Sequence, residues 1–191
     1  MPLLPFPSNR QATSFDCGAA ALQSVLYYFG VDVLEKDLVK ALKTTEDEGT
    51  APGYLAGYLV NRNFSVLASD NMTIKDLEFW LDRKSPIILL IQAWSEESDK
   101  DYSHALNDGH YVVAIGYDDR NIYFEDPSIL GHLGAIPRAE LDARWHDSDN
   151  NRLFEHFGIA VYGRKPAYDP NEILRIQAGK VAAAWLARKS G

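Results

Sequence analysis

The sequence predicts an α+β domain in which N-terminal helices pack on an antiparallel sheet. Three observations predict this class. Apolar residues recur at helical spacing in the first part of the chain, short β-rich runs follow later, and two of those runs flank a polar turn as in a hairpin. Because helices come first and strands later, a doubly wound parallel sheet, in which the two alternate, is disfavoured.

The N-terminal part is expected to contain an arm followed by helices. Residues 1–10 carry three prolines and no periodicity, which predicts an extended arm lying on the body. Apolar residues mark one face of a helix from Cys17 to Phe29, and Gly30 is typical of a helix end. Further helices are expected over residues 34–43, from Thr50 to about residue 62, and from the capping pattern Thr73–Asp76 to about residue 83.

The later part of the chain is expected to supply the sheet. Pro86–Gln92 is an unbroken apolar run, which predicts a strand buried on both faces. A three-residue loop, Asp118–Arg120, is expected to join two hairpin strands so that Tyr117 faces Asn121. Residues 95–108 are polar and predict a loop. The expected strands cover residues 64–68, 86–92, 110–117, 121–125 and 157–162.

The C-terminal segment predicts one more helix over residues 171–189. Its apolar stripe consists of Leu174, Ala178, Val181 and Trp185. We expect an arm at residues 1–10, one domain at residues 11–165 and a helical extension at residues 166–191. The extension could pack on the body, pair with a second copy or dock a partner.

Composition limits the classes of function. The chain of 191 residues has 19 Lys and Arg against 27 Asp and Glu, a net charge of −8, and no basic cluster, so nucleic acid is not an expected partner. Its longest apolar stretch, Pro86–Ile91, is far shorter than the ~20 residues that cross a bilayer, and the first residues lack a signal-peptide pattern. We expect a soluble, cytoplasmic protein without a transmembrane segment.

The functional interpretation depends on the single cysteine, Cys17. It cannot form an internal disulfide or a zinc site of several thiolates, and no metal or cofactor is expected. It lies in the first turn of a predicted helix, where unpaired N–H groups favour a thiolate, with Asp16 as the N-cap and Gly18 leaving room for a substrate carbonyl. The alternative is a buried cysteine that acts only as a small apolar side chain.

His110 is the histidine best placed to act as a base on Cys17. It begins an expected strand, and the three-residue loop would set it diagonally from Asp126 on the same face, with about 7–8 Å between their backbones. An even loop would put the two on opposite faces unless a β-bulge corrects the register. Asp126 could instead belong to an ordinary Asp-Pro turn. The other histidines are interpreted as surface or structural residues: His104, His132, His146 and His156.

Gln11 and two motifs complete the sequence argument. The side-chain amide of Gln11 could join the backbone N–H of Cys17 in holding an oxyanion. The pattern Q-x5-C-G-x-A-x-L over Gln11–Leu22 resembles the opening of the C39 peptidases, papain-like cysteine peptidases that process bacteriocin leader peptides. The H-x15-D spacing from His110 to Asp126 is similar to their second block, and Ile136–Trp145 resembles the helix and tryptophan that often follow. The resemblance covers about residues 11–163.

The resemblance implies a papain-like fold and a cysteine peptidase that needs no metal. It assigns Cys17 as nucleophile, His110 as base and later acid, Asp126 as the group that orients the imidazole, and Gln11 as oxyanion donor. It also implies a peptide or protein substrate with small residues at the cleavage site, and a stand-alone form without the transporter domains of bacteriocin exporters. Two alternatives remain: a non-catalytic peptide-binding module on the same fold, and a structural partner acting through the C-terminal helix.

Overall fold

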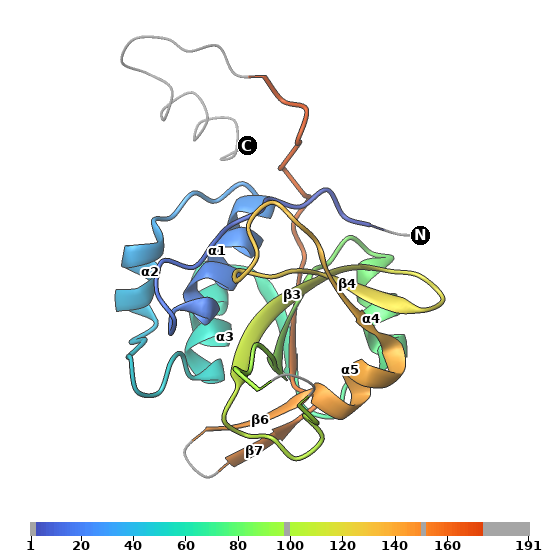
Figure 1. The fold of residues 1–191 in the computed structure, drawn as a ribbon. Coiled ribbons are helices and arrows are strands. Elements are labelled where there is room, and N and C mark those ends of the chain that lie inside the picture. The colour runs from blue at the N-terminus through green and yellow to red at the C-terminus, as the bar shows by residue number, and fades with distance from the viewer. Residues whose placement is uncertain (1–2, 98–99, 150–151, 174–191) are drawn as a thin grey trace.

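The computed structural model describes residues 3–97, 100–149 and 152–173. Helices lie on two sides of a central sheet, as Figure 1 shows. On one side are α1 (Cys17–Tyr28), α2 (Glu35–Ala41) and α3 (Pro52–Asn61), and on the other are α4 (Ile74–Leu81) and α5 (Arg138–Arg144). The expected α+β class is confirmed.

Six strands form one antiparallel sheet in the order β1-β8-β2-β3-β4-β5. The expected strands agree with the observed ones to within one residue at each end. Short β5 lies at the edge next to β4. The bounds are β1 (Ser65–Ser69), β2 (Ile87–Gln92), β3 (Gly109–Tyr117), β4 (Asn121–Glu125), β5 (Gly134–Pro137) and β8 (Gly158–Tyr162).

The centre of the sheet is buried on both faces. Every residue of β2 is buried, and so is β3 from His110 to Gly116, because α1 packs against β3 from one side and α4 packs against β2 and β3 from the other. This confirms the interpretation of the apolar run at residues 86–92. Each fully buried Leu or Ile contributes about 1.5–3 kcal/mol, so these two strands give the candidate site residues at their ends a rigid base.

Local signals set most of the helix ends. Gly30, at φ 82°, follows α1 in the left-handed conformation that favours glycine. The capping box before α4 is present: Asp76 N donates to Thr73 Oγ1 at 3.2 Å, and Thr73 N donates to Asp76 Oδ2 at 2.8 Å. Helix α3 begins at Pro52 with Ala51 as its N-cap, two residues after the expected start at Thr50.

A two-stranded hairpin was not expected from the sequence. It consists of β6 (His146–Asp149) and β7 (Arg152–Glu155) and forms a second, separate sheet at the lower edge of Figure 1. Both strands have four residues, and β6 is wholly polar, so neither carries the apolar alternation that marks a strand. Helix α5 falls within the Ile136–Trp145 segment that the family resemblance implied.

The N-terminal arm lies on the body as expected. Leu4 N donates to the carbonyl of Ile115 at 2.8 Å, and Asn9 N donates to Glu125 Oε1 at 2.7 Å. Glu125 is buried, and burial raises its pKa to about 7 despite the hydrogen bonds from the arm. The arm is therefore attached to β3 and to the residue that precedes Asp126.

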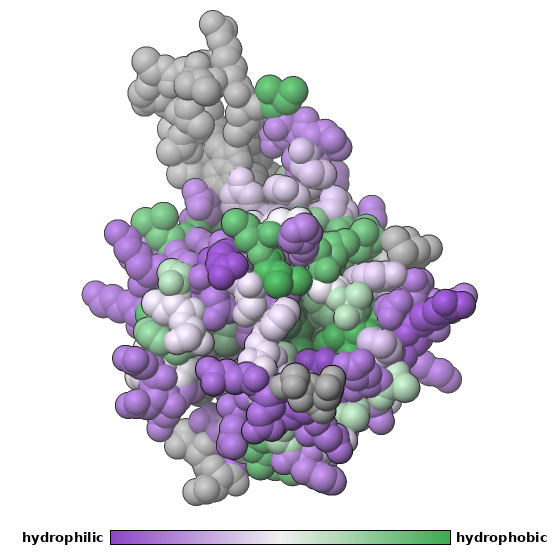
Figure 2. Space-filling view, viewed as in Figure 1, coloured by the Kyte–Doolittle hydropathy of each residue, from purple (hydrophilic) through white to green (hydrophobic). Residues whose placement is uncertain are grey.

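The chain beyond β8 continues along the body. Ala167 N and Tyr168 N both donate to the carbonyl of Tyr28 at the end of α1. Residues 171–173, where the expected C-terminal helix would begin, are not helical, and the rest of that helix, with its stripe Leu174, Ala178, Val181 and Trp185, lies outside the described residues. No helix within the described ranges is long and apolar enough to cross a membrane. Figure 2 shows hydrophilic residues around the rim of one face, with apolar residues gathered towards its centre.

Candidate active site

Three separate segments bring the candidate catalytic residues together. Cys17 is the first residue of α1, His110 is the second residue of β3, and Asp126 directly follows β4. Because α1 packs on β3 and β4 pairs with β3, the helix start and the two strand ends meet at one place. His110 and Asp126 are each 6% exposed and Cys17 is 9% exposed, so the site is a buried polar cluster beneath the surface.

The hairpin between β3 and β4 does not have the expected three-residue loop. Tyr117 pairs with Ile122 and not with Asn121. Asp118 N donates to the carbonyl of Asn121 at 3.0 Å, and the Asp118 carboxylate accepts from Asn121 N at 2.8 Å. The Asp118 side chain thus stabilises a tighter turn with an even number of residues. Such a turn alone would have put His110 and Asp126 on opposite faces.

A β-bulge restores the register. Ile115 is the extra residue on β3, and beyond it Val113 pairs with Glu125. The next residue, Asp126, therefore comes to the face that carries His110. The sequence-based requirement for an odd loop or a bulge is met by the bulge, and His110 Nε2 lies 2.7 Å from Asp126 Oδ1.

His110 carries a strongly perturbed imidazole. Burial lowers its pKa, but hydrogen bonds with Asp126 and Cys17, together with the charges of both groups, outweigh burial and raise the pKa from 6.5 to about 9. The bond to Asp126 uses Nε2, which leaves Nδ1 as the nitrogen available to the sulfur. Geometry and charge together favour the imidazolium form of His110 beside the Asp126 carboxylate.

Asp126 is held by three donors. Its Oδ1 accepts from His110 and also from Ser128 N at 2.8 Å, and its Oδ2 accepts from the indole Nε1 of Trp94 at 2.9 Å. Burial raises the pKa of Asp126, but these bonds and the charge of His110 leave it lowered overall. The carboxylate therefore remains ionised and fixed in orientation.

The surroundings of Cys17 differ from two expectations. Asp16 is the N-cap of α1 by position, but its carboxylate accepts from Thr13 N at 3.0 Å and does not bond the helix. Gly18 leaves no space for a substrate: a Cβ there would lie 2.8 Å from Cβ of Thr50 and 3.1 Å from the Tyr111 ring. The glycine instead lets α1 pack closely against Thr50 and Tyr111.

Gln11 lies beside the site and is held at both ends of its amide. Its Nε2 donates to the carbonyl of Thr13 at 2.8 Å, and its Oε1 accepts from Ser128 Oγ at 3.2 Å. Gln11 N also donates to the carbonyl of Pro127 at 3.0 Å. An amide nitrogen has two hydrogens, so the bond to Thr13 leaves one N–H for another acceptor.

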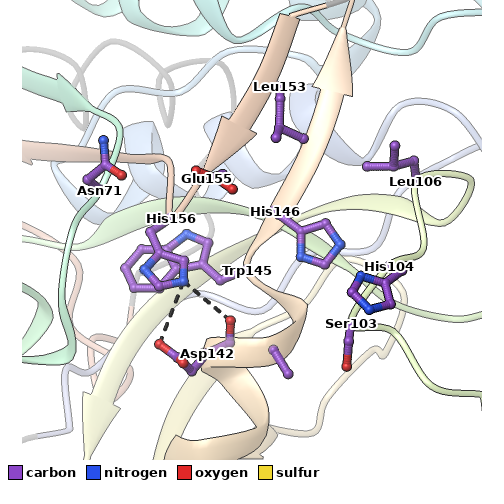
Figure 3. A pocket seen from close by; sticks show the side chains of 11 residues that line it. Asn71, Ser103, His104, Leu106, Asp142, Trp145, His146, Leu153, Glu155 and His156 are labelled. Atoms are coloured by element: carbon purple, nitrogen blue, oxygen red, sulfur yellow. Dashed lines mark hydrogen bonds and ion pairs between the residues drawn. The ribbon is translucent and has the colours of Figure 1, made fainter.

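Three of the remaining histidines line a different cavity, shown in Figure 3. His104, His146 and His156 contribute to its wall, and its volume is about 510 Å³. His146 Nε2 lies 2.8 Å from the carbonyl of Ala105, and His156 Nε2 lies 3.6 Å from the carboxylate of Asp142. Among the described residues, no group of three or more His, Cys, Asp or Glu is arranged to hold a metal ion.

Trp94 and Ser128 are the site residues that sequence reasoning missed. Both act on the Asp126 carboxylate, and both lie in irregular segments, where side-chain spacing carries no information on contacts. The sequence does place Ser128 two residues after Asp126, a spacing typical of a side chain bonding the backbone beyond it. Nothing in the sequence connects Trp94 to a residue 32 positions away.

Comparison with known proteins gives consistent matches. Residues 3–151 match the Peptidase C39-like family. The transport/processing ATP-binding protein ComA of Streptococcus pneumoniae is 30% identical over 139 residues, which are 71% of this chain and 17% of that protein. The chain thus spans about a sixth of the length of this relative.

Solved structures share the fold. A Bacillus anthracis protein assigned as a C39-like peptidase gives a TM-score of 0.66 at 16% identity, covering 85% of this chain and 97% of that one. The peptidase domain of Streptococcus ComA gives a TM-score of 0.59 at 18% identity, covering 80% of this chain and 95% of that one. A double glycine motif protease solved with a leader peptide gives a TM-score of 0.57 at 18% identity, covering 86% of this chain and 94% of that one. At these identities the likenesses show the fold, which is the papain-like fold of C39 peptidases.

Proposed function

The chain belongs to the Peptidase C39-like family, and from this premise we propose that it is a cysteine peptidase that hydrolyses peptide bonds. Cys17 is the nucleophile, His110 the general base and acid, Asp126 the residue that orients the imidazole, and Gln11 an oxyanion donor. The observation that carries the proposal is the 2.7 Å contact between His110 and Asp126, on an imidazole that also bonds Cys17.

The first half of the reaction makes a thioester. The Cys17 thiolate attacks the carbonyl carbon of the scissile bond, and a tetrahedral intermediate with an oxyanion forms. His110 then gives its proton to the leaving nitrogen, the C–N bond breaks, and the amine departs. Neutral His110 next takes a proton from the water that attacks the thioester, the C–S bond breaks, and the acid product leaves, which restores the Cys17 thiolate and the protonated His110.

The oxyanion would form at the start of α1. The first N–H groups of a helix have no partner within the helix, and the N-terminal end of the helix dipole favours negative charge. The free N–H of the Gln11 amide can add a second donor there. The bonds of Gln11 to Thr13 and Ser128 support this role because they fix the amide before substrate arrives.

The substrate we propose is a peptide with small residues at the cleavage site. The structural relative described as a double glycine motif protease in complex with a leader peptide supports this choice of substrate. The nucleophile must remain a free thiol, so the proposal also places the protein in a reducing compartment such as the cytoplasm.

The proposal is tested by incubating the protein with a peptide library enriched in Gly-Gly sequences and detecting new termini by mass spectrometry. We expect cleavage by the wild type and none by Cys17→Ala. Alkylation of Cys17 by iodoacetamide is measured across pH in parallel. A Cys17 that reacts as an ordinary thiol, unaffected by His110→Ala, would contradict the peptidase proposal and favour the non-catalytic peptide-binding module.

A further inference from the structure

We propose that Trp94 is a positioning residue of this site, whose indole N–H holds the Asp126 carboxylate so that its other oxygen faces His110. The inference deepens the proposed function and rests on it for its catalytic consequence. Trp94 does not touch the sulfur or the reacting bond, so it acts through Asp126.

The two oxygens of Asp126 have separate tasks. Oδ1 accepts from His110 Nε2 at 2.7 Å and from Ser128 N at 2.8 Å, whereas Oδ2 accepts from Trp94 Nε1 at 2.9 Å. A carboxylate bonded at one oxygen only can turn about its Cβ–Cγ bond and exchange a partner for water. With Trp94 on Oδ2, a turn that moved Oδ1 away from the imidazole would break a second charge-assisted bond.

Apolar burial does not account for the place of Trp94. Its side chain is 57% exposed, which is unusual for a large aromatic group. Its backbone has φ 63°, a left-handed conformation that a bulky residue seldom adopts. A residue in such a conformation persists only where the surroundings hold it, and such residues are common at functional sites. The one described hydrogen bond of the indole goes to Asp126.

The backbone on either side of Trp94 is fixed to the loop at residues 95–108. Ala93 N donates to the carbonyl of Asp108 at 2.9 Å, and Ser95 N donates to the hydroxyl of Tyr102 at 3.2 Å. Trp94 follows β2, whose last residue Gln92 pairs with Gly109 next to His110. The sheet and the loop thus deliver the indole to the far side of Asp126.

The test removes the N–H and keeps an aromatic ring. In Trp94→Phe we expect the rate constant for alkylation of Cys17 at pH 7 to fall roughly 3-fold to 10-fold, with unchanged far-UV circular dichroism. In an Asp126→Asn background the same substitution should change the rate less than about 2-fold, because both groups act through one carboxylate. Leu106→Ala, an exposed residue of the same loop, is the control and should leave the rate unchanged.

A second measurement does not depend on catalysis. The titration of the His110 ring, followed by NMR, should have a lower midpoint in Trp94→Phe than in the wild type, because the carboxylate facing the imidazolium is no longer held in place. An unchanged or higher midpoint, or equal rate losses in the wild-type and Asp126→Asn backgrounds, would overturn the inference. If the midpoint falls while wild-type Cys17 reacts as an ordinary thiol, the peptidase proposal fails and the positioning of Asp126 by Trp94 stands.

Discussion

His110 and His156 both lie near a carboxylate, but they use their ring nitrogens differently. His110 gives Nε2 to Asp126 Oδ1 at 2.7 Å and keeps Nδ1 for the sulfur of Cys17. His156 has backbone carbonyls at both nitrogens, with Met72 O 3.2 Å from Nδ1 and Asp142 O 3.3 Å from Nε2. Of these two histidines, His110 is the one left with a ring nitrogen that can serve a reaction.

The backbone around His156 supports a structural role. Its ring stacks on Trp145 with centroids 5.1 Å apart, its N–H donates to the carbonyl of Trp145 at 2.7 Å, and its carbonyl accepts from Met72 N at 3.1 Å. Its φ of 48° turns the chain between β7 and β8. His156 thus joins three segments of the chain. A histidine in a cavity with acidic neighbours is therefore weak support for catalysis unless one ring nitrogen remains uncommitted.

The largest expected effect is on the reactivity of Cys17. His110→Ala should lower the rate of peptide cleavage by roughly 10²-fold to 10⁴-fold, the range for loss of a general base. His156→Ala should change it less than about 2-fold, at a temperature where both variants are folded. Cleavage rates and iodoacetamide alkylation of Cys17 would check this. Equal losses of cleavage rate in the two variants would contradict the assignment of a catalytic role to His110 and a structural role to His156.

The next effect is a displaced titration. By NMR the His110 ring should titrate near pH 9, well above the ordinary value of 6.5, and Asp126→Asn should lower that pKa because the opposing carboxylate is lost. Since the folded pKa lies above the unfolded one, protonated His110 stabilises the fold fully below pH 6.5, and this contribution is lost as the pH rises through 9.

Urea unfolding between pH 7.5 and 9.5 would measure that loss, with His110→Gln as the control that lacks it. Glu125 also has a raised pKa, about 7 against 4.5. The stability that protonated Glu125 contributes is therefore lost as the pH rises through 7, mostly before this window begins. If the difference in free energy of unfolding between the wild type and His110→Gln does not change over this pH range, His110 is not protonated in the folded protein.

The smallest effect is on stability at the other histidine. His156→Ala should lower the free energy of unfolding by about 1–3 kcal/mol, because it removes the stacked ring and the two side-chain bonds while the backbone bonds remain. Urea unfolding at pH 7 measures this, with the exposed Leu153→Ala of the same cavity as the control. A destabilisation no greater than that of the control would show that the contacts of the His156 ring do not stabilise the fold.

Much of the fold could be predicted from the sequence because its central elements carry strong local signals. The buried run at residues 86–92, the helix from Cys17 and the Thr73–Asp76 capping box each depend on side chains close together in the chain. The β6–β7 hairpin lacked such a signal, since the stability of its polar strand comes from contacts such as Gln92 Nε2 with the carboxylate of Asp147 at 2.9 Å.

Four of the candidate site residues could be named from the sequence, whereas Trp94, Ser128 and the register that brings Asp126 to His110 could not. The spacing of His110 and Asp126 allowed contact only for certain registers, but whether a loop or a bulge supplies the register depends on how Asp118 bonds the turn. Gly18 could not be interpreted correctly either, because Thr50 and Tyr111 approach it from distant parts of the chain. The role of Trp94 could not be predicted for the same reason, because its partner Asp126 is 32 positions away in the chain.

Because of the bulge at Ile115, the site tolerates a change in chain length at one position of the β3–β4 hairpin and not at another. An insertion of two residues at the tip of the hairpin, around Asp119, keeps the parity of the pairing and leaves Asp126 on the face of His110. Deletion of Ile115 changes that parity and sends Asp126 to the opposite face, and it also removes the carbonyl to which Leu4 is bonded. Variation in length is therefore tolerable at the tip and costly four residues before Asp119, where the extra residue Ile115 maintains both the Asp126 register and the attachment of the arm.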